Sequence, residues 1–175
     1  MSRWTFNLHI HLTAVLLSSL LAGCGTTAYV QQTESSKPLS EPDSSVLPTK
    51  VGDEIALRAI SLVGKPYRYG GADLHGFDCS GLVYYIHQAL GLAVPRTAAD
   101  QQRAAISVDR TDLLPGDLLF FKTTSSKYIS HVGIYVGENR FVHAPQSGKL
   151  IELRTLDDEY YGSRLAGSGR LYGPS

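Results

Sequence analysis

One cysteine in this 175-residue chain has the setting of a catalytic nucleophile. Cys79 follows a glycine-rich segment, residues 67–77, and opens a run of residues with helical spacing. A thiol attacks as its thiolate, and the unpaired N–H groups at a helix N-terminus lower the pKa of a cysteine there. The only other cysteine is Cys24, so Cys79 has no disulfide partner if Cys24 is modified. We therefore predict Cys79 as the nucleophile.

A cysteine nucleophile needs a base, and histidine is the usual one. Two of the six histidines, His131 and His143, lie on predicted strands. In 132–136 the branched apolar residues are even-numbered, so His131 faces the opposite side of its strand. We predict this pair as the base and its partner. The others fit poorly, because they lie in the N-terminal segment, in the loop before Cys79, or about 12 Å along its helix: His9, His11, His75 and His87.

The elements that must position these residues change type midway along the chain. Apolar residues at helical spacing predict a helix over 51–63 and another over 79–90, the latter capped by Asp78 and ended by Gly91. Thr97 opens a short third helix. After Pro115-Gly116 the pattern becomes short apolar segments that predict strands at 118–122, 132–136, 140–144 and 150–154. Helices followed by strands indicate an α+β fold in which the Cys79 helix packs on an antiparallel sheet.

The hairpin at Gly137-Glu138-Asn139 decides whether the two histidines can meet. A two-residue turn at Glu138-Asn139 would pair His143 with Ile134, on the face away from His131. A three-residue loop would pair His143 with Gly133, and so place it beside His131. We predict the three-residue loop, a left-handed Asn139, and both histidines on the Cys79 side of the sheet.

The N-terminal 50 residues have the pattern of an export signal followed by a tether. Residues 1–23 combine Arg3 with an apolar run too short to span a bilayer, which predicts a signal peptide. Leu21-Ala22-Gly23-Cys24 resembles a bacterial lipobox, so Cys24 is expected to carry lipid; the alternative is an ordinary signal peptide with an incidental Cys24. Gly25 is not the Asp of an inner-membrane retention signal, which favours the outer membrane, facing the periplasm, in a Gram-negative cell. Residues 24–50 predict a disordered tether, and 51–175 the folded domain.

Composition excludes some classes of partner. Sixteen basic and sixteen acidic residues give a net charge of zero, which offers no electrostatic case for nucleic acid. No pair of candidate ligands shows the spacing of a zinc site, so we expect neither metal nor cofactor. We expect a monomer whose one membrane contact is the Cys24 lipid.

Several ordered motifs resemble the NlpC-type family of cell-wall cysteine peptidases, over about residues 51–172. They are Tyr67-Arg68-Tyr69-Gly70-Gly71, Gly76-Phe77-Asp78-Cys79-Ser80-Gly81-Leu82-Val83, Pro95-Arg96-Thr97, Leu114-Pro115-Gly116-Asp117-Leu118, His131-Val132-Gly133-Ile134-Tyr135-Val136-Gly137 and Phe141-Val142-His143-Ala144. The lipobox, short tether and single domain are most similar to the Spr (MepS) branch of single-domain lipoproteins.

The resemblance implies a papain-like fold and a peptidoglycan endopeptidase acting on stem peptides. It implies Cys79 as nucleophile, His131 as general base and acid, His143 as the group that orients His131, and Tyr67 as an oxyanion donor. It also places three positions near the substrate cleft: Asp78, Ser80 and Arg96. Asp78 could equally be only a helix cap, and Arg96 only a solvated charge.

The bond that is cut stays open at this point. The Spr-like organisation favours the crosslink from D-Ala to meso-diaminopimelate, whereas the wider family more often cuts between γ-D-glutamate and the diamino acid. Two further alternatives are a catalytically silent wall-binding lipoprotein and an acyltransferase or amidase with the same Cys-His chemistry. The intact Cys79, His131 and His143 argue against the first, and the lack of an apolar stretch for acyl chains outside the signal peptide argues against the second.

Overall fold

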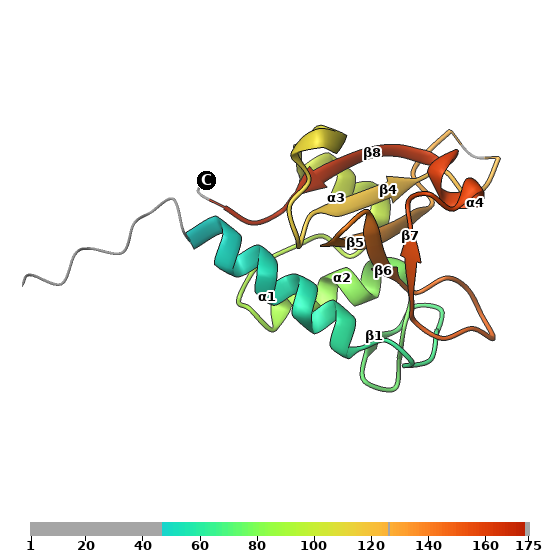
Figure 1. Ribbon diagram of the computed structural model, residues 1–175. Coiled ribbons are helices and arrows are strands. Elements are labelled where there is room, and N and C mark those ends of the chain that lie inside the picture. Colours follow the sequence, from blue (N-terminus) through green and yellow to red (C-terminus); the bar gives the residue numbers. More distant parts are fainter. Residues whose placement is uncertain (1–46, 126, 174–175) are drawn as a thin grey trace, which may run out of the picture. The chain divides into compact units, whose positions relative to one another are not determined.

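The computed structural model describes residues 47–125 and 127–173 (Figure 1). The predicted signal peptide, Cys24 and most of the predicted tether lie outside the described residues. Within the described ranges, no helix has both the length and the apolar character needed to cross a membrane.

The first helix, α1 (Leu47–Ser61), begins four residues earlier than the sequence pattern predicted. Residues 47–50 were expected to belong to the disordered tether, but a proline, here Pro48, is tolerated in the first turn of a helix, where its missing N–H has no partner to lose. The helix buries Ile55 and Ala59, and Leu62 just after its end is also buried, whereas Val63 is exposed.

Cys79 opens the second helix, α2 (Cys79–Gln88), as predicted. This helix buries Leu82, Val83 and Ile86 in the core, but it ends before the predicted Leu90 and leaves Ala89 exposed. The third helix is α3 (Ala98–Ala104), whose first turn is capped by Thr97 as predicted.

The main sheet has six antiparallel strands in the order β3-β8-β4-β5-β6-β7. The four predicted strands are confirmed with shifts of one or two residues at their ends. Sequence patterning missed the six other elements, β1, β2, β3, β8, η1 and α4. The strands of the sheet are β3 (Ile106–Ser107), β4 (Leu118–Phe121), β5 (His131–Gly137), β6 (Arg140–His143), β7 (Glu152–Thr155) and β8 (Leu165–Arg170). The remaining elements are the hairpin β1 (Ala72–Asp73) and β2 (Gly76–Phe77), the 3₁₀ turn η1 (Arg110–Asp112) and the short helix α4 (Glu159–Gly162).

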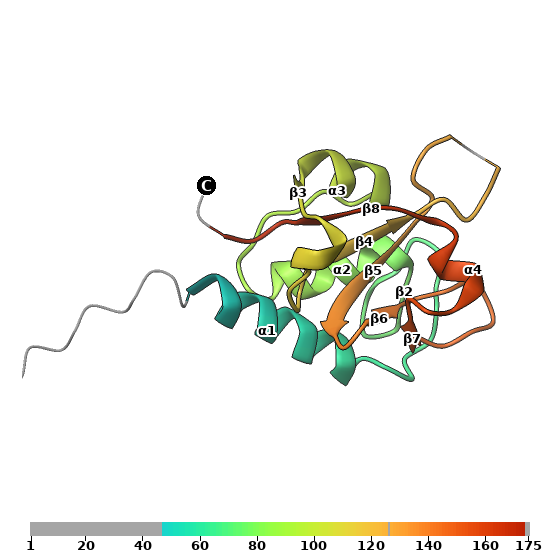
Figure 2. The same cartoon turned by 45° about the horizontal axis from the view of Figure 1, so that its top comes forward.

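The two faces of this sheet bury different sets of side chains. Figures 1 and 2 show α1 and α2 lying against one face. That face contributes Phe120, Val132, Ile134 and Val142 to the main core. The other face carries a smaller apolar cluster of Leu119, Phe121, Phe141 and Leu156, against which Tyr161 of α4 packs. The predicted α+β fold, with helices on an antiparallel sheet, is confirmed.

The loop of the β5–β6 hairpin is shorter than predicted, but His143 still lies on the same face as His131. Gly137 pairs with Arg140, so the loop has two residues rather than three, and both Glu138 (φ 50°) and Asn139 (φ 58°) are left-handed. The register then shifts between Tyr135 and Gly137, and Ile134 pairs with Val142. This β-bulge absorbs one residue, so His143 shares a face with His131, as predicted.

Candidate active site

The first turn of α2 fixes the backbone around Cys79. The side chain of Asp78 caps the helix by accepting the N–H of Gly81 at 2.6 Å. The carbonyl of Gly71 approaches this turn so closely that a Cβ at Gly81 would lie 1.9 Å from its oxygen. Gly71 also accepts the N–H of Asp78 at 3.0 Å. The glycine-rich loop is thereby packed directly on the helix start that carries Cys79.

The electrostatics of Cys79 differ from the sequence-based expectation. Burial and the neighbouring carboxylate of Asp78 raise the pKa of its thiol, and they outweigh the backbone N–H groups of Val132, Ser80 and Cys79 itself, which lower it. The prediction of a lowered pKa was therefore wrong. The same N–H contact brings the sulfur against Val132, the residue after His131.

His131 and His143 form a hydrogen-bonded pair. Nε2 of His131 lies 2.9 Å from Nδ1 of His143, and the ring centroids are 5.0 Å apart. This confirms the prediction that His143 lies beside His131. Because Nε2 of His131 is engaged, its Nδ1 is the atom left for a proton from the sulfur.

Aromatic rings enclose the histidine pair on the second face of the sheet. Phe121 lies 6.0 Å from His131, Phe141 lies 5.1 Å from His143, and Tyr161 lies 4.8 Å from His143, all between ring centroids. Burial lowers the pKa of each imidazole to about 3. The predicted Cys79 side of the sheet was therefore wrong: the histidines lie with Phe121 and Phe141 on the face opposite α2, and the sulfur of Cys79 contacts the backbone N–H of Val132, the residue after His131.

Two charged residues of β7, Glu152 and Arg154, follow His143 in a chain of contacts that begins at His131. Nε2 of His143 is buried and makes no hydrogen bond to any described residue, yet it lies 3.4 Å from Oε1 of Glu152. That same oxygen accepts the Nε–H of Arg154 at 2.8 Å. Sequence patterning missed Glu152, Arg154 and Tyr161; the alternation of charged and apolar residues in 152–154 was the only available signal, and it also fits an ordinary exposed strand.

Tyr67 lies beside the nucleophile, as the resemblance implied. Its backbone N–H donates to the carbonyl of Lys149 at 2.9 Å, which holds it against the β6–β7 loop. Burial and the nearby Cys79 and Asp78 raise the pKa of its hydroxyl, so this group keeps its proton at neutral pH and can donate it in a hydrogen bond.

The three residues expected near the substrate cleft form one network. Arg96 donates to both carboxylate oxygens of Asp78, at 2.9 and 2.7 Å, and to the hydroxyl of Ser80 at 3.1 Å. These bonds keep the pKa of Asp78 below its usual range despite partial burial. Asp78 is thus both a helix cap and an ion-pair partner, and Arg96 is not merely a solvated charge.

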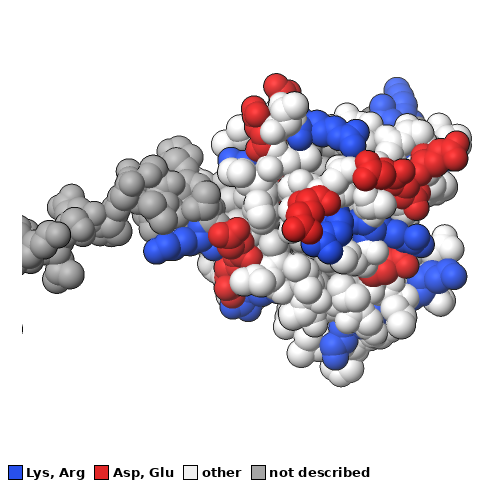
Figure 3. Space-filling view, in the orientation of Figure 1, with Lys and Arg blue, Asp and Glu red and all other residues white. Residues whose placement is uncertain are grey.

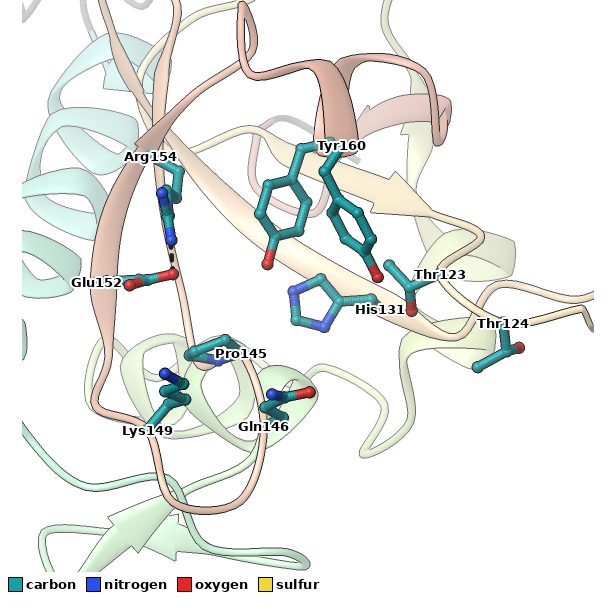
Figure 4. Close-up of a pocket in the computed structure, with 10 residues that line it drawn as sticks. Thr123, Thr124, His131, Pro145, Gln146, Lys149, Glu152, Arg154 and Tyr160 are labelled. Atoms are coloured by element: carbon teal, nitrogen blue, oxygen red, sulfur yellow. Dashed lines mark hydrogen bonds and ion pairs between the residues drawn. The ribbon is translucent and has the colours of Figure 1, made fainter.

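Two hollows open next to these residues. One, of about 560 Å³, is lined by Tyr67, Cys79 and the Asp78-Ser80-Arg96 network. The other, of about 460 Å³, is lined by His131 together with Lys149, Glu152 and Arg154 (Figure 4). In the view of Figure 3, acidic and basic side chains are interspersed over the surface.

The two other histidines that the structure describes stand apart from this site. His75 is exposed and contacts Asp73, and Nδ1 of His87 bonds the carbonyl of Val83 inside the core. Within the part of the chain that the structure describes, no group of three or more His, Cys, Asp or Glu residues could hold a metal ion.

Residues 64–170 match the model of the NlpC/P60 family. The chain belongs to the NlpC/P60 family. It is 40% identical over 116 residues to the murein DD-endopeptidase MepH of Escherichia coli, covering 64% of this chain and 43% of that protein. It is also 40% identical over 121 residues to a γ-D-glutamyl-L-lysine dipeptidyl-peptidase of Bacillus subtilis, covering 69% of this chain and 41% of the other.

A solved structure supports the fold assignment. An NlpC/P60 family protein from Bacillus cereus superimposes with a TM-score of 0.66 at 32% identity, over 71% of this chain and 41% of that one. The predicted papain-like fold is confirmed. The chain spans about two fifths of the length of these relatives.

Proposed function

We propose that this NlpC/P60 chain is a peptidoglycan endopeptidase with Cys79 as its nucleophile. One observation carries the proposal: a thiol at a helix start lies against the strand whose His131 is hydrogen-bonded to His143 at 2.9 Å. Nucleophile, base and orienting group are the parts that a thiol peptidase requires.

The reaction begins from a neutral pair, because burial disfavours both the thiolate and the imidazolium. Nδ1 of His131 takes the thiol proton as the sulfur bonds to the peptide carbonyl carbon. The oxyanion accepts hydrogen bonds from the backbone N–H of Cys79 and the hydroxyl of Tyr67. His131 then gives its proton to the leaving amine as the C–N bond breaks, and later activates the water that cleaves the thioester.

The two hollows support cleavage within a peptide rather than at its end, since each side of the reacting pair has room for substrate. Asp78, Ser80 and Arg96 would bind the acyl part, which precedes the cut. Lys149 and Arg154 outnumber Glu152 in the other hollow, so its wall carries a net positive charge. That charge favours a leaving residue with a free carboxylate, such as meso-diaminopimelate.

The bond cleaved is proposed to be the D-Ala to meso-diaminopimelate crosslink, and the alternative is the γ-D-glutamyl bond to the diamino acid. The printed names of the relatives include both a murein DD-endopeptidase and a γ-D-glutamyl-L-lysine peptidase. In the cell envelope, lipid on Cys24 would hold a monomeric domain at the outer membrane. Residues 24–46 would be part of the link between the lipid and the domain that acts on the wall.

The test is product analysis by mass spectrometry. Sacculi and purified crosslinked muropeptide dimers are incubated with the wild-type chain or with Cys79→Ser. Conversion of dimers to intact monomers by the wild type alone supports the crosslink proposal. Monomers that lack the diamino acid would support the γ-D-glutamyl alternative, and unchanged substrates would support a silent wall-binding protein.

A further inference from the structure

We infer that Glu152 is a positioning residue: its carboxylate fixes the proton on Nε2 of His143, and through it the tautomer of His131 that can act as base. This inference rests on the proposed function for its catalytic meaning. Its structural basis is the continuous row from His131 through His143 to Glu152 and Arg154.

The surroundings of the buried Nε2 of His143 determine whether this nitrogen carries a proton. Nε2 of His143 lies 3.4 Å from Oε1 of Glu152, and its ring is fully buried. An unprotonated Nε2 would place its lone pair against a carboxylate oxygen in a desolvated site, which is unfavourable. A protonated Nε2 meets an acceptor there. The contact is too poorly aligned to be a hydrogen bond, but such contacts can tighten in the substrate complex.

Fixing one proton fixes the next. A neutral imidazole carries one N–H, so a proton on Nε2 of His143 leaves Nδ1 as an acceptor. Nε2 of His131, at 2.9 Å, must then be the donor. The one proton of His131 is thereby placed on Nε2, and its Nδ1 is bare and ready to accept the proton of Cys79.

The opposite arrangement would block the chemistry. If His143 carried its proton on Nδ1, it would donate to Nε2 of His131. His131 would then hold its own proton on Nδ1, where no lone pair would face the thiol. Nothing else in the contact between the two rings selects between these arrangements, because either nitrogen can donate across it.

Arg154 holds Glu152 in place for this role. Its Nε–H donates to Oε1 of Glu152 at 2.8 Å, and its guanidinium lies 3.8 Å from Asp158 at the start of α4. Figure 4 shows Glu152 and Arg154 side by side in the wall of the hollow that also contains His131. The hydrogen bond from Arg154 thus holds the carboxylate of Glu152 next to Nε2 of His143.

The direct test is histidine tautomer assignment in the full chain, by two-bond ¹H–¹⁵N spectra of ¹⁵N-histidine-labelled protein at pH 7. Wild-type His143 and His131 are both expected as Nε2–H tautomers. In Glu152→Met, which removes the acceptor at similar size, His143 should show substantial Nδ1–H character. A wild-type His143 in the Nδ1–H form would overturn the inference without bearing on whether the protein is a peptidase.

Kinetics on crosslinked dimers provide the second readout. Glu152→Met should lower kcat by about 10- to 100-fold, the range found when a hydrogen-bond partner that orients a metal-bound histidine is removed. Glu152→Gln retains an acceptor oxygen and should recover most of the rate. The matched control is Glu138→Met, because Glu138 also pairs with an arginine two residues along, Arg140, but on the far turn of the hairpin. A Glu152→Met rate within twofold of the control would contradict the inference.

Discussion

Substituting Gly133 by alanine should disrupt the histidine pair indirectly, by displacing the ring of Phe141 that packs against His143. A Cβ at this position would lie 2.6 Å from Cδ2 of Phe141, well inside van der Waals contact. The φ angle of Gly133 is not in the left-handed region, so the backbone itself accepts alanine and the ring contact alone opposes it.

The ring of Phe141 has little room to move. It is fully buried, with Phe121 and Tyr161 each 5.3 Å away and His143 at 5.1 Å, between centroids. Overpacking of this kind typically costs about 1–3 kcal/mol of unfolding free energy. Displacing the ring also moves His143, and an error of about 1 Å in such a group lowers kcat by on the order of 100-fold.

The assay is urea unfolding of the full chain, followed by circular dichroism, together with kcat on crosslinked dimers. Gly167→Ala on strand β8, which β4 separates from β5, is the control, because the nearest atom to its Cβ would be 4.0 Å away. Adding Phe141→Leu to Gly133→Ala should recover stability relative to the sum of the single changes, by about 1 kcal/mol of coupling. The packing explanation is refuted if the unfolding free energies of Gly133→Ala and Gly167→Ala differ by less than about 0.5 kcal/mol.

Three further predictions concern the anchor, the oxyanion and acid stability. Cys24→Ala should release the protein from membrane fractions and leave its activity on soluble muropeptides unchanged; finding unacylated wild-type Cys24 by mass spectrometry would contradict the anchor. Tyr67→Phe removes one oxyanion donor and should lower kcat about 100- to 1000-fold with KM nearly unchanged; a fall of less than tenfold would remove Tyr67 from the mechanism. Burial lowers the pKa of His131 and His143 to about 3, below the unfolded value of about 6.5. Between these two pH values the unfolded chain binds protons that the folded protein does not, so the free energy of unfolding decreases as the pH falls from 6.5 towards 3. Above pH 6.5 the contribution of the two histidines to stability is complete. Each contributes a slope approaching about 1.4 kcal/mol per pH unit in that window, and His143→Asn should make the urea-measured slope shallower; an unchanged slope would contradict the buried, neutral state.

The sequence predicted the parts of the site that depend on local periodicity. Helical spacing placed Cys79 at a helix start, and alternation along 132–136 placed His131 away from the main core. The capping roles of Asp78 and Thr97 are also local, because each side chain bonds an N–H only three residues away.

The hairpin shows where local reasoning stops. Glutamate rarely adopts positive φ, so residue preferences did not indicate a two-residue turn with Glu138 left-handed. The bulge that restores the register is selected by packing of the sheet, since it puts Phe141 and His143 on the second face. The prediction about His143 was therefore correct in its outcome and wrong in its reason.

The thiol pKa and the residues behind His143 depend on tertiary structure. Helix position alone favours a thiolate at Cys79, but burial and Asp78 reverse the direction. Glu152 and Tyr161 reach the histidines because β7 and α4 fold over the second face of the sheet. No spacing in 150–162 indicates that approach.

We propose that Cys79 forms a covalent acyl intermediate with the wall peptide during turnover. The most direct test of this proposal is tandem mass spectrometry of the full chain, acid-quenched during turnover of crosslinked dimers. We expect the acyl part of the donor stem peptide attached to Cys79 as a thioester, and no such adduct in Cys79→Ser, which should fold normally but leave sacculi intact. Absence of the adduct, together with a Cys79→Ser variant that solubilises sacculi within a few-fold of the wild-type rate, would contradict the account.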